Sequence, residues 1–120
     1  MRNPHKAQGN NHEALVLTYL TNATGHNYRP ARPTQSTFRD QGDIHLGPFA
    51  LQLKSSPRGV SQATNYLMDA REQAATAGLP FGAAVIKNQL APGVDADLVV
   101  MDLETFTVLL NAATEGSWVE

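Results

Sequence analysis

Residues 42–54 combine the alternation of a β-strand with polar residues where a buried sheet is normally apolar. Apolar side chains take one set of alternate positions around a Gly47-Pro48 turn, and Asp43, Gln52 and Lys54 belong to the other set. A two-residue loop would put Asp43 opposite Gln52, with their Cβ atoms roughly 4.5 to 5.5 Å apart and Lys54 further along the same face. A carboxylate, an amide oxygen and an ammonium this close suit a hard metal ion, a phosphate and an attacking water.

Two further side chains could take part in this chemistry. His45 shares the strand face of Asp43 and could support a ligand or carry a proton, although an imidazole at a sheet edge is commonly only solvated. Glu13 precedes Leu17 by four residues and Leu20 by seven, so in a helix it lies on or beside the buried face. As a site residue, Glu13 requires the fold to bring this helix onto the polar face of the hairpin. Otherwise it is a first-turn acid favoured by the helix dipole.

The composition of the chain limits its class. At 120 residues it is long enough for one domain with a single core. It has no cysteine, which excludes disulfides, thiolate metal sites and cysteine nucleophiles. The polar N-terminus contains no stretch apolar enough for a signal peptide or a membrane span. We therefore expect a soluble cytoplasmic protein without a membrane partner.

The charges are unevenly distributed along the chain. The net charge is −2, but residues 1–60 hold seven Lys and Arg against three Asp and Glu, whereas residues 61–120 hold two against eight. A basic half that contains the hairpin could face a polyanion while the acidic half faces solvent. The same charges could also simply cover a solvated surface.

The predicted elements alternate between helices and strands. Residues 1–10 are polar and without period, which predicts a flexible tail, and residues 11–120 form one domain. Within it we expect a helix over 11–24, the hairpin, a helix over 61–77, a strand over 81–86, a short buried strand over 98–101 and a helix over 102–113. This order, α-β-β-α-β-β-α, predicts an α/β class with a mixed sheet flanked by helices. Residues 27–41 are a loop or one edge strand with a loop, so a further strand could lie in 27–39.

The order Asp43, eight residues, Gln52, one residue, Lys54 resembles the PD-(D/E)xK nuclease superfamily, which carries these groups on a hairpin. The upstream helix with Glu13 and the helix after the lysine also match that superfamily. The chain is most similar to small phage and actinobacterial Holliday-junction resolvase-like nucleases. The similarity extends over about residues 13–110, and it is carried by the segments 38–44, 70–74, 84–87 and 99–106.

This resemblance implies a restriction-endonuclease-like fold and a set of site residues. Glu13, Asp43 and Gln52 would surround one or two Mg²⁺ ions, for which Mn²⁺ can substitute, with the Leu53 carbonyl as a further ligand. Lys54 would hold the attacking water or the scissile phosphate. Gln52 departs from the usual glutamate, and a neutral ligand weakens binding of a divalent ion. This departure is compatible with low intrinsic activity, with a preference for Mn²⁺ or with an inactive relative.

A second pattern is similar to another branch of the superfamily. Gln62 and Tyr66 form a Q-x-x-x-Y sequence, which resembles the motif that follows the catalytic lysine of RecB-like exonucleases. The two side chains share a helix face and could touch a phosphate and a base, but packing of Tyr66 on the sheet explains the pattern equally well. The residues expected to contact nucleic acid are Arg29, Arg32, Arg39, Arg58, Gln62, Tyr66 and Lys87.

The sequence thus predicts a metal-dependent DNA endonuclease that cleaves phosphodiester bonds of branched DNA such as Holliday junctions, inside a cell that could be a phage host. Cleavage of both exchanging strands requires two active sites, so we expect a C2 homodimer. The alternatives are a RecB-like exonuclease and a DNA-binding or assembly module that keeps the nuclease fold with weakened catalysis.

Overall fold

A computed structural model describes the backbone of residues 4–30 and 44–115, with side chains described for 11–28 and 44–115. The elements in chain order are α1 (Pro4–Thr24), β1 (Tyr28–Pro30), β2 (Ile44–Leu46), β3 (Phe49–Lys54), α2 (Ala63–Ala77), β4 (Phe81–Ile86), the 3₁₀ turn η1 (Val94–Ala96), β5 (Leu98–Val100) and α3 (Leu103–Glu115). The five strands form one sheet in the order β1-β2-β3-β4-β5, and only the β3–β4 pair is parallel. The predicted mixed α/β class is therefore confirmed.

The β2–β3 hairpin has the predicted register. Leu46 pairs with Phe49, His45 with Ala50, and Ile44 with Leu51. Gly47 has φ +54°, and the proline ring that follows fixes a negative φ, which is the combination found in a type II′ hairpin turn. Continuing this register would pair position 43 with Gln52, but Asp43 lies outside the described residues.

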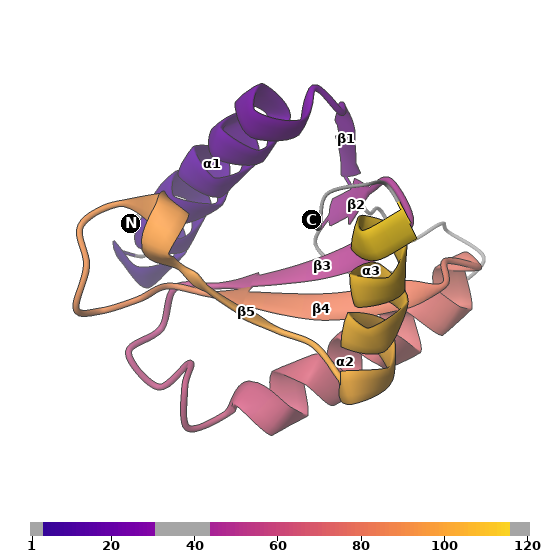
Figure 1. The fold of residues 1–120 in the computed structure, drawn as a ribbon. Coiled ribbons are helices and arrows are strands. Elements are labelled where there is room, and N and C mark those ends of the chain that lie inside the picture. The colour runs from indigo at the N-terminus through magenta and orange to yellow at the C-terminus, as the bar shows by residue number, and fades with distance from the viewer. Residues whose placement is uncertain (1–3, 31–43, 116–120) are drawn as a thin grey trace.

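The connection from β3 through α2 to β4 determines how the sheet is covered. Because β3 and β4 are parallel, the chain must cross back over the sheet, and α2 makes this crossing on one face. Figure 1 shows α2 on this face and α1 on the opposite one. The helix is held very close to β4, since a Cβ added at Gly82 would lie 2.7 Å from the backbone nitrogen of Arg71 and closer still to the Ala70 carbonyl. Glycine at position 82 therefore permits this approach.

Replacing Gly82 with alanine should destabilise the fold by about 1 to 3 kcal/mol, because backbone has to move to admit the methyl group. Chemical denaturation of Gly82→Ala would measure this loss. Gly93→Ala is the matched control, since its added Cβ meets the carboxylate end of Asp95, a flexible side chain that can turn away. A loss from Gly82→Ala no larger than that from Gly93→Ala would contradict the close packing of α2 on β4.

The main apolar core lies between α1 and the sheet. Its buried members are Val16, Leu17, Ile44, Leu51, Ala83 and Val85. The helix begins at Pro4 rather than near Asn11, so the predicted tail over residues 1–10 is wrong for 4–10. Proline suits the first turn of a helix, and the polar residues after it gave no apolar period that could have indicated a helix. Two apolar residues of the same helix, Leu15 and Tyr19, are exposed and do not belong to this core.

The C-terminal part of the chain is less buried than predicted. The strand expected over 98–101 forms as β5, but it is the edge of the sheet, and Leu98 and Val99 are exposed rather than buried. Of the side chains on α3, only Thr105 is buried. The apolar residues Phe106 and Leu110 of this helix are about half exposed.

Asp102 connects α3 to α2. Its Oδ1 accepts a hydrogen bond from the Thr105 backbone N–H at 2.7 Å, which caps the N-terminus of α3, and its Oδ2 lies 3.2 Å from Nε of Arg71 on α2. The hydrogen bonds from Thr105, aided by the Arg71 charge, hold the pKa of Asp102 below its ordinary value of 3.8. A hollow of about 180 Å³ lies beside this contact, between α2 and the beginnings of β4 and α3.

Asp102→Ala should lower the free energy of unfolding at pH 7 by about 0.5 to 2 kcal/mol through loss of the cap. Because the folded-state pKa is lowered, this stabilisation is complete above the unfolded-state pKa and is lost as the pH falls through the folded-state value. Urea denaturation from pH 7 to 3 should therefore show the two proteins converging below about pH 4. Asp102→Asn, which keeps a cap, is the control. A difference that stays constant over this range would exclude the ionised cap.

Candidate functional site

The predicted site residues of β3 lie on the face covered by α2. Side chains alternate along a strand, so Leu51 and Leu53 belong to the α1 face while Gln52 and Lys54 point to the α2 face. Contacts with residues of α2 confirm this assignment for both Gln52 and Lys54. We call this side of the hairpin and β3 the polar face.

Gln52 is inside the interface between β3 and α2. The residue is 3% exposed, and its Nε2 donates a hydrogen bond to Oε1 of Gln73 on α2. A buried amide without such a partner would cost about 1 to 3 kcal/mol, so the pair allows a polar residue to occupy a central strand. The amide of Gln52 therefore has a structural role in the described fold, whatever else it does.

Lys54 and Tyr66 meet on the polar face. The Lys54 Nζ lies 5.0 Å from the centre of the Tyr66 ring, within the range of a cation–π contact. Both residues are half-buried. The contact joins the last residue of β3 to the first turn of α2, so the lysine of the Q-x-K sequence and the tyrosine of the Q-x-x-x-Y sequence are brought together.

Other predicted DNA-contacting residues lie near the carboxyl ends of β3 and β4. The Lys87 backbone N–H donates to the Lys54 carbonyl at 2.8 Å, and Arg58 is exposed on the loop that leads from β3 to α2. Gln62 is exposed at the N-cap of α2, and its Oε1 accepts a hydrogen bond from Asn65 rather than capping the helix. The positive end of the α2 dipole and these cations favour an anion in the same area.

Glu13 is not brought to the polar face. It lies on α1, which packs on the opposite side of the sheet from Gln52 and Lys54. The requirement that the first helix cover the polar face is therefore not met, because α2 already covers it. Glu13 is half-buried and lines an open hollow of about 300 Å³ together with Ala14, Leu17 and Tyr28.

The structure describes several of the predicted site residues only partly or not at all. Asp43, Arg32 and Arg39 lie outside the described residues. Arg29 is described only as part of β1, where it pairs with His45. The Leu53 side chain packs against the α1 core, and His45 is half-buried on β2.

The described residues alone do not make a magnesium site. Mg²⁺ favours an octahedron of hard oxygen donors. Glu13 and Gln52, the two described ligands with side-chain oxygens, lie on opposite faces of the sheet, and no cluster of three or more His, Asp or Glu in the described ranges could hold a metal ion. An ion on the polar face would depend on a carboxylate from Asp43.

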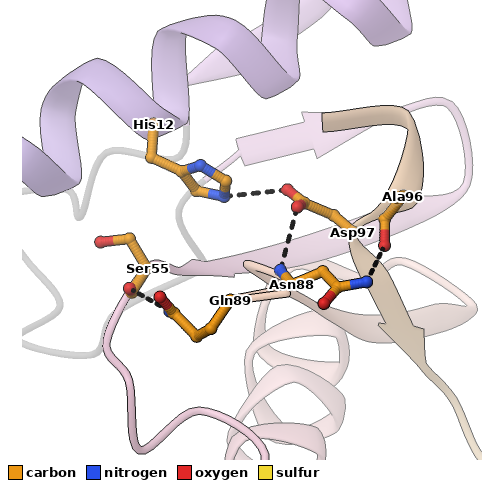
Figure 2. A network of polar contacts seen from close by, with 6 residues as sticks. All are labelled: His12, Ser55, Asn88, Gln89, Ala96 and Asp97. Carbon is orange, nitrogen blue, oxygen red and sulfur yellow. Dashed lines mark hydrogen bonds and ion pairs between the residues drawn. The ribbon is translucent and has the colours of Figure 1, made fainter. Parts of the chain in front are cut away.

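A buried polar network that the sequence did not indicate ties α1 to the β4–β5 connection (Figure 2). Nε2 of His12 lies 3.0 Å from Oδ2 of Asp97, and both side chains are nearly fully buried. Asp97 also accepts a hydrogen bond from the Asn88 backbone, and Gln89 donates to the Ser55 carbonyl. His12 and Asp97 are 85 residues apart, so spacing alone could not reveal the pair. Its evident role is to fix α1 against this connection.

No protein-family model, curated protein or solved structure matches this chain. Within the described residues, no helix combines the length and the apolarity that crossing a membrane would take. The functional argument therefore rests on the fold, on the arrangement of side chains and on the sequence patterns described above.

Gln52→Glu tests whether position 52 can hold a metal ion. Without Mg²⁺ the variant should be less stable than the wild type, because a carboxylate replaces a buried amide. If Gln52 belongs to a ligand set, Mg²⁺ at about 100 times its dissociation constant should return on the order of 2.7 kcal/mol of stability. Thermal denaturation with Mg²⁺ and with EDTA would measure this recovery.

Gln73→Glu provides the matched control, since it puts a carboxylate into the same amide pair from α2 instead of β3. An equal Mg²⁺ response in both variants, or none in Gln52→Glu, would exclude Gln52 from the ligand set that the sequence predicted.

Proposed function

We propose that the protein is a DNA endonuclease of the PD-(D/E)xK type that cleaves branched DNA such as Holliday junctions. The observation that carries this proposal is the contact between Lys54 and Tyr66 beside Gln52 on the polar face. These residues belong to two sequence patterns that each resemble nucleases of this superfamily. Their meeting at one strand end is what a shared phosphodiester site requires.

The polar face would bind the DNA backbone through its cations. Lys54 is a compact charge at the end of β3, held over an aromatic ring that limits its freedom, and it would contact the scissile phosphate. Arg58 is exposed on the adjoining loop and would contact a neighbouring phosphate. Tyr66 would offer its ring to a base exposed at a branch point, since stacking tolerates any base sequence.

The resemblance also implies a magnesium ion, which would activate water and neutralise developing charge. Because the described donors do not form its site, the proposal assigns the chemistry to Asp43 and Lys54 and removes Glu13 from the set. Gln52 enters only as the residue that packs the polar face against α2.

The second candidate is a DNA-binding or assembly module that does not cleave. The buried pair between Gln52 and Gln73 favours it, because a neutral amide that is already hydrogen-bonded replaces the usual catalytic glutamate. Such a module would keep the cations of the polar face and bind the same branched DNA. A RecB-like exonuclease, the third reading, would instead need a DNA end.

Incubating the protein with a synthetic four-way junction, linear duplex and single strands, with Mg²⁺ or Mn²⁺, should give symmetric cuts near the branch point of the junction only. Asp43→Ala should abolish cleavage, and Lys54→Ala should slow it by about 10²- to 10³-fold through loss of charge stabilisation in the transition state. Denaturing gels would measure the rates, and electrophoretic mobility shifts would measure binding.

Arg71→Ala is the control for loss of a positive charge, since Arg71 lies further along α2 and pairs with Asp102. It should cleave like the wild type. Binding of the junction without cleavage under either metal would support the non-cleaving module instead. Degradation from linear ends would support the exonuclease, and full activity in Lys54→Ala would overturn the site.

A further inference from the structure

Among the large apolar side chains that the structure describes, that of Leu90 is the most exposed, at 96%. Leu90 lies in the connection between β4 and η1, which extends past the end of the sheet where β3 and β4 stop (Figure 1). A single exposed leucine is common on a protein surface and needs no explanation by itself. Leu90 differs in the support that its backbone receives and in the charges that lie beside it.

Hydrogen bonds fix the loop that carries Leu90. Asn88 Oδ1 accepts a hydrogen bond from the Leu90 backbone N–H at 3.0 Å, and Asn88 Nδ2 donates to the Ala96 carbonyl, also at 3.0 Å. Gln89 Nε2 donates to the Ser55 carbonyl at 3.1 Å, which ties the loop to the residue directly after β3 (Figure 2). A preorganised backbone therefore presents the Leu90 side chain to solvent, so that little ordering would remain to be done when a ligand covers it.

The side of the loop that touches the end of β3 is basic. Residues 88–94 contain no charged side chain. Lys87 comes directly before them, and its backbone N–H donates to the Lys54 carbonyl at 2.8 Å. Arg58 is exposed on the loop that follows β3, whereas the nearest acid along the chain, Asp95, comes only at the far end of the connection, in η1. A polyanion held by these cations would pass beside Leu90.

We propose that Leu90 is a wedge that enters the branch point of the DNA, an inference that rests on the proposed binding of branched DNA. Leucine is one of the apolar residues that DNA-binding proteins insert between stacked bases. Unstacking costs least where pairing is already interrupted, as at the centre of a four-way junction. Leu90 therefore buries its side chain at a junction but not in a continuous duplex, and it gives the domain its preference for branched DNA.

Electrophoretic mobility shifts in EDTA test the wedge without any cleavage. Leu90→Ser should weaken binding of a four-way junction by about tenfold or more, since burial of a leucine side chain contributes at least that factor, and should leave binding of linear duplex unchanged. Leu90→Met, which keeps an apolar wedge, should bind the junction like the wild type. Leu103→Ser is the matched control, because Leu103 is 78% exposed but begins α3, after β5 has returned to the opposite end of the sheet. It should also bind like the wild type.

A fluorescent base at the branch point reports the wedge directly. The base analogue 2-aminopurine becomes brighter when it is unstacked, so the saturating wild type and Leu90→Met should raise its emission, whereas Leu90→Ser should not.

The outcomes separate the wedge from the proposed function. Junction binding and emission that are unchanged in Leu90→Ser would overturn the wedge and leave the proposed function in place. An equal loss of binding to junction and linear duplex would also overturn it, because a wedge discriminates between the two. A wild type that binds no junction would overturn the proposed function, and the wedge with it.

Discussion

The parallel pairing of β3 with β4 is the constraint on which the rest of the structure depends. Two parallel neighbours cannot be joined by a turn, so the chain crosses the sheet through α2, and such crossovers are almost always right-handed. The handedness fixes the face on which α2 lies, and Gly82 lets it approach the strand closely. The face with Leu51 and Val85 is then left for α1. The separation of Glu13 from Gln52 follows directly from this connection.

The same constraint limits where chemistry can occur on the polar face. In the middle of β3 the helix excludes solvent, and Gln52 is tolerated because Gln73 hydrogen-bonds with it. Two residues later, where the strand ends and α2 begins, Lys54 is only half-buried and its ammonium reaches the Tyr66 ring. In open parallel α/β sheets, ligands likewise bind beyond the carboxyl ends of the strands. The proposed phosphate contact of Lys54 therefore lies at the strand end and not along the strand.

Local patterns in the sequence predicted the parts of the fold that depend on local physics. The alternation around Gly47-Pro48 gave the hairpin register, and the apolar run of residues 81–86 gave the bounds of β4. The face covered by each helix depends on chain crossing, which no local period encodes, so Glu13 was assigned to the wrong side. The pair of His12 with Asp97 joins residues too distant in sequence for spacing to indicate it. Exposure of β5 was missed because an apolar run looks the same in a central strand and at an edge.

Two buried polar pairs help to fix the positions of the helices in this domain, whose apolar core is small. The largest fully buried side chains are Ile44 and Ile86, and many of the other core positions hold alanine. On one face Gln52 and Gln73 fix α2 to the sheet, and on the other His12 and Asp97 fix α1 to the β4–β5 connection. Within the described residues, neither His12 Nε2 nor Asp97 Oδ2 has a hydrogen-bond partner, so the ion-pair contact at 3.0 Å between the two atoms is what offsets their burial. Removing one member of such a pair leaves a buried polar group uncompensated, whereas replacing both can be nearly neutral. The two pairs therefore specify how the helices are seated more than they add to net stability, and the apolar contacts of Val16, Leu17 and Ala70 supply the attraction.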